Sequence, residues 1–219
     1  LPQSNVDRLV QTLNSLITLS YDNWKYSPYL NKDDSNAASL SQPGFNDSSW
    51  ETMKLRERYS LDYCWLRKEI VLPERMLGQP VSGPAKLLLT VDDYGYLWVN
   101  GESKGYFPWN GEFELSRDAK PGEKFLIVIK AINTGGPLRL LRAELELEKF
   151  IPFRQSIQDL CLSLQVGQKL LSFDTSQTSS WRREDPGIDK SKFDRAEKTR
   201  LNNLLQELVS QVDVEALKN

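Results

Sequence analysis

The pair Asn100-Gly101 follows directly on an aromatic, strand-like segment, residues 91–99. An Asn-Gly pair favours a tight hairpin, because both residues tolerate the positive φ angles of a type I′ turn. Side chains alternate along a strand, so we expect Tyr96 and Trp98 to share one face while smaller apolar residues occupy the other. The segment therefore predicts half of a β-hairpin, with one face for a core and two large rings on the opposite face.

The composition limits the chemistry that is open to this chain. Its 219 residues include no histidine and two cysteines, Cys64 and Cys161. Without histidine, a Ser-His-Asp triad, a Cys-His dyad and a His-Glu-x-x-His zinc helix are excluded. Catalysis would have to use carboxylates, Lys, Tyr or an oxygen-ligated cation, which among enzymes favours glycoside hydrolysis. Both cysteines adjoin apolar residues, and we predict that they are buried free thiols.

Charge and hydropathy restrict the partners. The formal net charge of −2 gives no basic surface of the kind that binds nucleic-acid phosphates. No apolar run approaches the roughly 18 residues that a membrane span requires. The chain begins with Leu1 rather than Met, which suggests a removed secretion signal and an extracellular or periplasmic location. We therefore expect neither a nucleic-acid partner nor a membrane span.

Helical patterns occupy both ends of the chain. In residues 4–19 apolar side chains recur at helical spacing, and Ser4 with Asp7 resembles a capping box. After Phe150 the spacing is helical again, with Pro152 suited to a first helical turn. This second predicted helix has an apolar face made of Phe153, Ile157, Leu160, Cys161 and Leu164.

A third helix is predicted near the C-terminus. Residues 172–190 are polar and indicate a linker, and Ser191 with Asp194 is a candidate cap for the helix that follows. Its apolar stripe comprises Leu201, Leu204, Leu205, Leu208 and Val212. The stripe either packs back on the sandwich or docks on a partner outside this chain.

Between these helices the sequence predicts an antiparallel sandwich. Short apolar segments separated by Pro and Gly turns are typical of a jelly roll. The segments are residues 63–72, 86–91, 91–99, 111–115, 124–132 and 138–147. Residues 27–49 are rich in Ser, Asn and Asp and are predicted to be irregular. The overall prediction is an α+β, mainly β protein, with an N-terminal amphipathic helix in 1–26, a jelly-roll β-sandwich in 27–150 and a helical appendage in 151–219.

Several motifs occur in a characteristic order within the predicted sandwich. They are Asn46-Asp47-Ser48-Ser49-Trp50, residues 64–73 (Cys-Trp-Leu-Arg-Lys-Glu-Ile-Val-Leu-Pro), residues 97–102 (Leu-Trp-Val-Asn-Gly-Glu) followed by Gly105, then Phe113, Pro121-Gly122-Glu123-Lys124 and Ala131-Ile132-Asn133. This ordered set resembles the N-terminal sugar-binding-type domain, a galactose-binding-like sandwich, of family 2 glycoside hydrolases and family 38 α-mannosidases. Residues 152–215 look more like the linker that precedes the catalytic domain in family 38 than like the family 2 arrangement.

The resemblance implies a non-catalytic, carbohydrate-associated module of a glycoside hydrolase, of α-mannosidase type in one reading. Such a module contacts sugar through loop aromatics or positions a catalytic domain, so its expected partners are carbohydrate and that domain. The alternative is a structural or protein-interaction module without sugar binding, which docks through its terminal helices. A self-contained glycosidase is a third hypothesis.

Candidate ligand-binding residues lie on loops at one end of the predicted sandwich. Aromatic faces stack on sugar rings, and Asp, Asn and Arg bond their hydroxyls. The candidates are Asp92, Asp93, Tyr106, Phe107, Trp109, Asn110, Asn133 and Arg139. Phe107 and Trp109 could instead plug the end of the sandwich or pack under a neighbouring domain. For Tyr96 and Trp98 we favour a position beneath one of the amphipathic helices over a role as a sugar platform.

Two pairs of carboxylates bear on possible catalysis. Asp92 and Asp93 are adjacent in a strand, so we expect them to face opposite sides rather than flank one glycosidic bond. Glu112 and Glu114 share a face about 7 Å apart but lie side by side on one strand, as solvated edge charges do. We expect no catalytic residue, cofactor or assigned metal in this chain. A structural Ca²⁺ near the Asp pair or near Asn46-Asp47 stays open, since no EF-hand spacing supports it.

Overall fold

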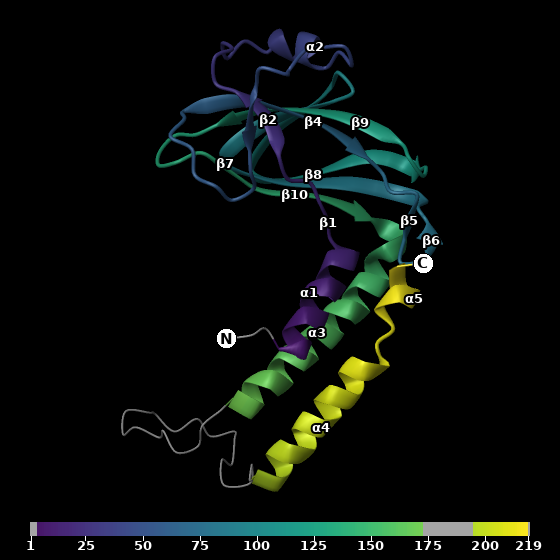
Figure 1. The fold of residues 1–219 in the computed structure, drawn as a ribbon. Coiled ribbons are helices and arrows are strands. Elements are labelled where there is room, and N and C mark those ends of the chain that lie inside the picture. The colour runs from purple at the N-terminus through teal and green to yellow at the C-terminus, as the bar shows by residue number, and fades with distance from the viewer. Residues whose placement is uncertain (1–3, 173–194, 219) are drawn as a thin grey trace. The chain divides into compact units, whose positions relative to one another are not determined.

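The computed structural model describes residues 4–172 and 195–218, and it divides into two units (Figure 1). The sheet unit comprises residues 18–151, and the helical unit comprises residues up to Ile17 together with those from Pro152 onward. The predicted linker after Ser172 and the predicted cap at Ser191 and Asp194 lie outside the described residues. Across the part of the chain that the structure describes, no helix combines the length and apolar character of a membrane span.

The sheet unit is built on a curled antiparallel sheet (Figure 1). Its strands are β1 (Leu19–Ser20), β2 (Trp24–Ser27), β3 (Glu51–Met53), β4 (Tyr63–Val71), β7 (Gly83–Val99), β8 (Glu102–Ala119), β9 (Lys124–Ile132) and β10 (Arg139–Leu147). They follow the order β1-β10-β7-β9-β4-β2-β3, and β8 pairs with β7. A separate small hairpin joins β5 (Arg75–Met76) to β6 (Gln79–Pro80), and a short helix α2 (Asn36–Leu40) and a 3-10 turn η1 (Glu148–Phe150) complete the unit.

Strand β7 changes partner part-way along its length. Residues 85–92 pair with β10, residues 94–99 pair with β9, and β8 pairs with β7 on both sides of this change. The predicted turn at Asn100 and Gly101 is confirmed, since the two residues join β7 to β8 with φ angles of 50° and 84°. The β7–β8 ribbon therefore connects the strands around β9 with those around β10.

The core of the sheet unit forms on the inner face of this ribbon and its neighbours. Leu97 and Val99 enter it together with Leu66 and Ile129, as alternation along the strands predicts. The buried area is continuous from Trp24 on β2 to residues of β10. The sheet also takes in residues 19–26, which we predicted to lie with the N-terminal helix.

The outer face of the sheet is covered by residues that we predicted to be irregular. Trp98 packs with Trp65 beneath Ala37 and Leu40 of α2. The expected cover over Trp98 is therefore present, but it is α2 and its flanking loop rather than one of the terminal amphipathic helices. Arg67 of β4 anchors this cover, because its guanidinium donates hydrogen bonds to two backbone carbonyls of the loop and to the Asp47 carboxylate.

The helical unit consists of α1 (Asn5–Ile17), α3 (Ile151–Ser172), α4 (Arg195–Gln211) and α5 (Val214–Lys218). The predicted capping box is confirmed at the start of α1: the Asp7 N–H donates to Ser4 Oγ at 3.1 Å, and the Ser4 N–H donates to the Asp7 carboxylate at 3.2 Å. The hydroxyl of Ser4 lowers the pKa of Asp7. The buried cluster that joins the helices comprises Val6, Leu9, Val10, Leu13, Cys161, Leu164 and Leu205.

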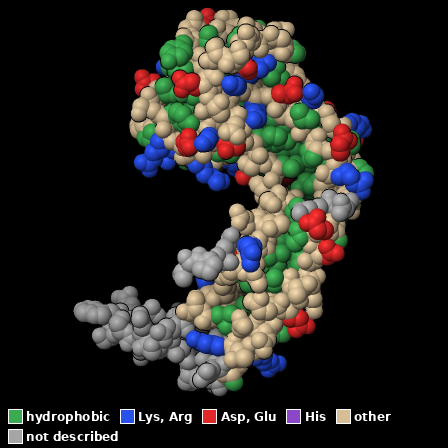
Figure 2. Space-filling model, in the orientation of Figure 1, with side chains coloured by type: hydrophobic (Ala, Val, Ile, Leu, Met, Phe, Trp, Pro, Cys, Tyr) green, Lys and Arg blue, Asp and Glu red, His purple; other side chains and the backbone are tan. Residues whose placement is uncertain are grey.

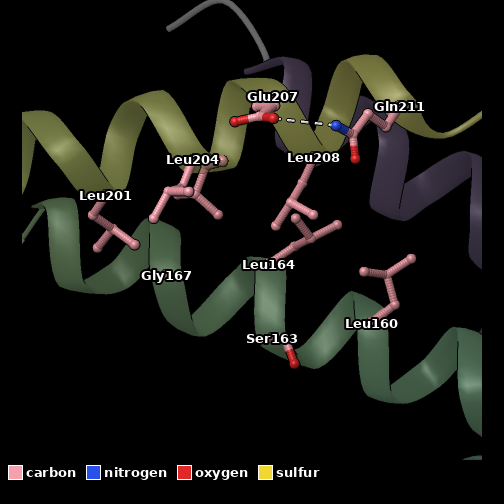
Figure 3. A pocket seen from close by; sticks show the side chains of 10 residues that line it. Leu160, Ser163, Leu164, Gly167, Leu201, Leu204, Glu207, Leu208 and Gln211 are labelled. Carbon is pink, nitrogen blue, oxygen red and sulfur yellow. Dashed lines mark hydrogen bonds between the residues drawn. The ribbon is translucent and has the colours of Figure 1, made fainter.

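The last apolar stripe packs only in part. Leu205 enters the cluster with α1 and α3, so the terminal helices pack on one another. The stripe alone does not indicate this packing between distant segments of the chain. Leu204 and Leu208 remain 48% and 44% exposed and line a groove of about 360 Å³ between α3 and α4 (Figure 3). Figure 2 shows hydrophobic side chains at the surface along these helices. The close approach of α4 depends on Gly167, where a Cβ would lie 3.0 Å from Leu205 Cδ2.

Substitution of Leu13 by alanine tests this packing. Leu13 has no exposed surface, so Leu13→Ala should lower the free energy of unfolding of the helical unit by about 3 kcal/mol through lost burial and a cavity. Leu162→Ala is the matched control, because Leu162 is 60% exposed on α3 and its loss should change stability by less than about 0.5 kcal/mol. Denaturant unfolding measures both stability changes, with amide exchange in α1 and α4 as the probe. Equal effects of the two variants would contradict the described packing.

Candidate functional site

A break in the pairing of β7 and β8 organises the candidate site. Thr90 pairs with Asn110 and Tyr94 pairs with Pro108. Between these two pairs β7 holds three residues, 91–93, whereas β8 holds only Trp109. The peptide between the two aspartates of this segment is cis. Because the two strands differ in length here, side chains at the break are free from regular alternation. We call this part of the sheet unit the rim.

A buried ion pair closes the rim on the side of β10. Arg139 lies opposite Asp92 in the β7–β10 register, and its Nε and Nη2 both donate to Asp92 Oδ2, at 2.8 and 2.6 Å. The Asp92 residue is 6% exposed. Burial of a carboxylate without such a partner would be strongly unfavourable, so this pair keeps β10 and β7 in register.

The Asp93 carboxylate holds the segment that follows β9. It accepts hydrogen bonds from the Thr134 N–H at 2.7 Å and from the Thr134 hydroxyl. These bonds, with the hydroxyl contributing most, lower the pKa of Asp93. The expectation that alternation places Asp92 and Asp93 on opposite sides is wrong. At the break both carboxylates bond to the same segment, residues 133–139, because neither strand imposes its alternation there.

Two further candidates are engaged in hydrogen bonds within the sheet unit. The Asn133 amide donates to the carbonyls of Leu61 and Gly136, at 3.0 and 2.8 Å, and the residue is buried. Asn110 Oδ1 accepts a hydrogen bond from the Thr90 hydroxyl at 2.6 Å. These contacts fix the turn after β9 and the β7–β8 pairing. The polar candidates therefore stabilise the rim from within.

We predicted that the aromatic candidates lie on a loop. They lie instead within the long strand β8. Phe107 is 2% exposed and packs edge-to-face against Phe113 in the core. A Cβ at Gly95 would come within 2.7 Å of the Phe107 ring, so glycine there makes room for it. Phe107 was predicted either to bind a ligand or to plug the sandwich, and the structure shows it filling the interior.

Tyr106 is 55% exposed and faces the opposite side of the sheet from Phe107. Its ring centroid lies 5.6 Å from those of Tyr94 and Tyr96. The ammonium of Lys130 lies 4.4 Å from the Tyr96 centroid, forms an ion pair with Asp34, and is almost fully buried. Sequence reasoning did not include Lys130, because its place beside the tyrosine is set by the β7–β9 register.

Trp109 is the exposed aromatic residue at the rim. It is 43% exposed and has a φ angle of 47°, in the left-handed region that side chains other than glycine rarely adopt. Such a conformation costs of order 1–3 kcal/mol and persists only where the surrounding structure imposes it. Here the pairs on either side of the break impose it. The rim thus exposes the Trp109 indole on the strand that faces the segment of the two aspartates.

Other chemistry-bearing residues do not form a catalytic group. Glu114 pairs with Arg117, and Glu112 lies beside it on β8 as an exposed edge residue does. Cys64 and Cys161 are buried free thiols, as predicted, and burial raises the pKa of both. Within residues 4–172 and 195–218, no three acidic or sulfur ligands come together as a metal site would require.

Aromatic side chains also gather at a second place in the sheet unit, which the sequence analysis did not single out. A hollow of about 250 Å³ lies where β2 and β3 end, with Tyr26, Tyr29 and Trp50 among its lining residues. The local signal was present, since a serine and a proline separate the two tyrosines. That Trp50 lies beside them follows only from the β2–β3 pairing.

Comparisons with known proteins give matches among solved structures alone. No protein-family model matches the sequence, and no curated protein does. The β-glucuronidase of Faecalibacterium prausnitzii is similar with a TM-score of 0.40 and 16% identity, over 52% of this chain and 21% of that protein.

Two further solved structures are of Bacteroides origin. β-Glucuronidase 2 of Bacteroides uniformis has a TM-score of 0.45 and 14% identity, over 58% of this chain and 17% of the enzyme. A glycosyl hydrolase family 2 member from Bacteroides cellulosilyticus has a TM-score of 0.44 and 14% identity, over 59% of this chain and 20% of that protein. The chain spans about a fifth of the length of the proteins it matches.

Replacement of Thr134 by valine tests the bonds to Asp93. Valine keeps the shape and the backbone N–H but removes the hydroxyl, so Thr134→Val should raise the pKa of Asp93 toward its ordinary value. A carboxylate with a lowered folded-state pKa contributes stability above its unfolded pKa and loses it as the pH falls through the folded pKa. The stability difference between the two proteins should therefore shrink at acidic pH. Carbon-detected NMR titration of the Asp93 carboxyl measures the shift, and an unchanged pKa would disprove the contact.

Removal of the Arg139 guanidinium tests the buried pair. Arg139→Met should cost about 3 kcal/mol of unfolding free energy, because the Asp92 carboxylate stays buried without its partner. The double variant Asp92→Asn with Arg139→Met removes the unpaired charge as well and should recover at least half of this loss. Urea unfolding of the three proteins measures both effects. A double variant no more stable than Arg139→Met would argue against the pair.

Proposed function

We propose that this chain is a non-catalytic, carbohydrate-associated accessory module of a glycoside hydrolase, with a galactose-binding-like, jelly-roll type of sandwich. The ordered motifs from Asn46 to Asn133 support this proposal, because they resemble those of a domain type found beside catalytic domains. The rim supports it independently, since it combines an exposed aromatic ring with fixed polar groups. This combination suits a sugar, whose ring has an apolar C–H face and a polar hydroxyl edge.

The observation that carries the proposal is the position of Trp109. Its indole is exposed, its backbone is held in the left-handed region, and Asp93 lies on the facing strand. We assign Trp109 as the face on which a sugar ring stacks and Asp93 as an acceptor for a sugar hydroxyl. Asp92, Arg139 and Asn133 act as positioning residues, because their side chains are bonded within the rim.

The resemblance of residues 152–215 to a family 38 linker makes an α-mannosidase the proposed parent enzyme and mannose the first sugar to test. Contact by a single stacked ring implies weak binding, in the millimolar range of dissociation constants. Such affinity is sufficient for a module that is tethered to its catalytic domain, because tethering raises the effective concentration of the partner site.

Titration of the full chain with simple glycosides tests the rim. Methyl α-D-mannopyranoside, methyl β-D-galactopyranoside and methyl β-D-glucuronide are added to nitrogen-labelled protein. The Trp109 indole signal is followed by NMR together with the backbone N–H signal of Thr134 at the rim, which also reports binding in a variant without the indole. We expect a saturable shift with at least one glycoside and a loss of affinity of about tenfold in Trp109→Ala, since stacking on an aromatic ring contributes roughly 1–3 kcal/mol.

Val71→Ala is the matched control for this titration. Val71 is 43% exposed, as is Trp109, but it lies at the end of β4. This variant should bind as the parent protein does. Absence of any shift at Trp109 with all three glycosides would refute sugar contact at the rim.

A protein-interaction module is the second candidate function, and the groove between α3 and α4 favours it. The exposed leucines that line the groove (Figure 3) are of the kind found in docking surfaces for an apolar helix. The two candidates separate with Leu208→Glu. This variant would prevent association with a catalytic domain in a co-purification experiment but would leave the glycoside titration unchanged.

A further inference from the structure

The hollow where β2 ends and β3 begins is a concave surface of the sheet unit. It is lined by Tyr26, Ser27, Pro28, Tyr29, Ser49, Trp50 and Glu51. None of these residues belongs to the rim, and along the sheet β3 lies four strand spacings from β7. The hollow is therefore separate from the residues assigned at the rim.

The aromatic walls of the hollow differ in exposure. Tyr26 is buried, and Trp50 is fixed by edge-to-face contact with Phe45 at 5.7 Å and by a hydrogen bond from Lys25 Nζ to its carbonyl at 3.0 Å. Tyr29, in contrast, is 87% exposed. An exposed tyrosine beside fixed aromatic rings can close over a flat ligand at little cost to the fold.

The polar side chains of the hollow are one carboxylate, that of Glu51, and several hydroxyl groups. Glu51 Oε2 accepts the hydroxyl of Tyr26 at 2.7 Å. Burial raises the pKa of Tyr26, and the nearby Glu51 raises it further. This tyrosine therefore keeps its proton and remains a donor to the carboxylate. The phenol oxygen keeps a lone pair for a ligand, and the hydroxyls of Ser27 and Ser49 can both donate and accept. A ligand that bonds to the carboxylate and to these hydroxyls needs groups that donate and accept, as O–H groups do.

We infer that this hollow binds one ring of a neutral sugar and forms a carbohydrate subsite separate from the rim. The ring hydroxyls supply donors to Glu51 and to the tyrosine oxygen, and the C–H face lies against Trp50 or Tyr29. A volume of about 250 Å³ is below the 300–1,000 Å³ typical of pockets for larger ligands, so one ring fits and the rest of a glycan stays outside.

A proline-rich peptide fits the hollow less well. It offers mostly carbonyl acceptors and few N–H donors, so it would leave the Glu51 carboxylate without a new partner. A ligand rich in hydroxyl groups avoids this difficulty, because each hydroxyl both donates and accepts.

The experiment is an NMR titration of the full chain that follows the Trp50 indole signal. The probes are methyl α-D-mannopyranoside, methyl β-D-glucopyranoside, methyl β-D-galactopyranoside and a polyproline decapeptide. We expect a saturable shift of the Trp50 signal with at least one glycoside and none with the decapeptide. Tyr29→Ala and Glu51→Gln should each weaken binding about tenfold, and both should fold, because each side chain is exposed.

Val71→Ala is the control that should leave the Trp50 titration unchanged, because this exposed residue lies outside the hollow. The inference is overturned if no glycoside shifts the Trp50 signal, if only the decapeptide does, or if neither Tyr29→Ala nor Glu51→Gln weakens binding. A glycoside that shifts the Trp109 signal alone would support the rim and refute the hollow. The opposite result would refute sugar contact at the rim and support the hollow.

Discussion

The sheet unit depends on one long ribbon that pairs with two different neighbours. Over its 17 residues β7 is paired with β8, while its other side meets β10 first and β9 afterwards. Leu87 and Leu97, on the two halves of β7, both enter the same core. The hydrogen bonds of a single strand thereby hold both layers of the curled sheet together. The change of partner has a local consequence, since the β7–β8 register breaks where one neighbour gives way to the next.

That break explains why acidic and basic side chains gather at the rim. Residues there lie between layers and are partly buried, so their charges need partners. Arg139 neutralises Asp92, and Thr134 satisfies Asp93. Thr134 lies in the segment between β9 and β10, and Arg139 is the first residue of β10, so the same bonds hold this segment at both ends. The polar residues that suggest sugar binding in the sequence thus act first as supports, and their chief contribution to function is the fixed position of Trp109.

Local patterns predicted the parts of this structure that depend on neighbours in sequence. The alternation that sends Leu97 inward, the turn at Gly101 and the capping box at Ser4 all follow from spacing over a few residues. Helix α2 escaped prediction because it has only five residues and its N-cap, Ser35, makes no side-chain capping bond. Residues 106–110 resembled a loop because proline and asparagine are rare in strands, yet all of them except Trp109 pair with β7. The packing of α1 with α4 joins opposite ends of the chain, which periodicity cannot reveal.

The fates of Phe107 and Trp109 show what sequence reasoning about aromatic sites lacks. The two residues are separated by one position on the same strand, and strict alternation would give them the same environment. The register break separates them, so that Phe107 fills the core beside Gly95 and Trp109 reaches the surface. The hollow arises in a related way, because Tyr26 and Glu51 are the last pair of the β2–β3 ladder. In both places aromatic rings become accessible where regular pairing stops. Candidate binding residues in a sheet of this kind are therefore found from the interruptions of its ladders, which depend on pairing between distant strands.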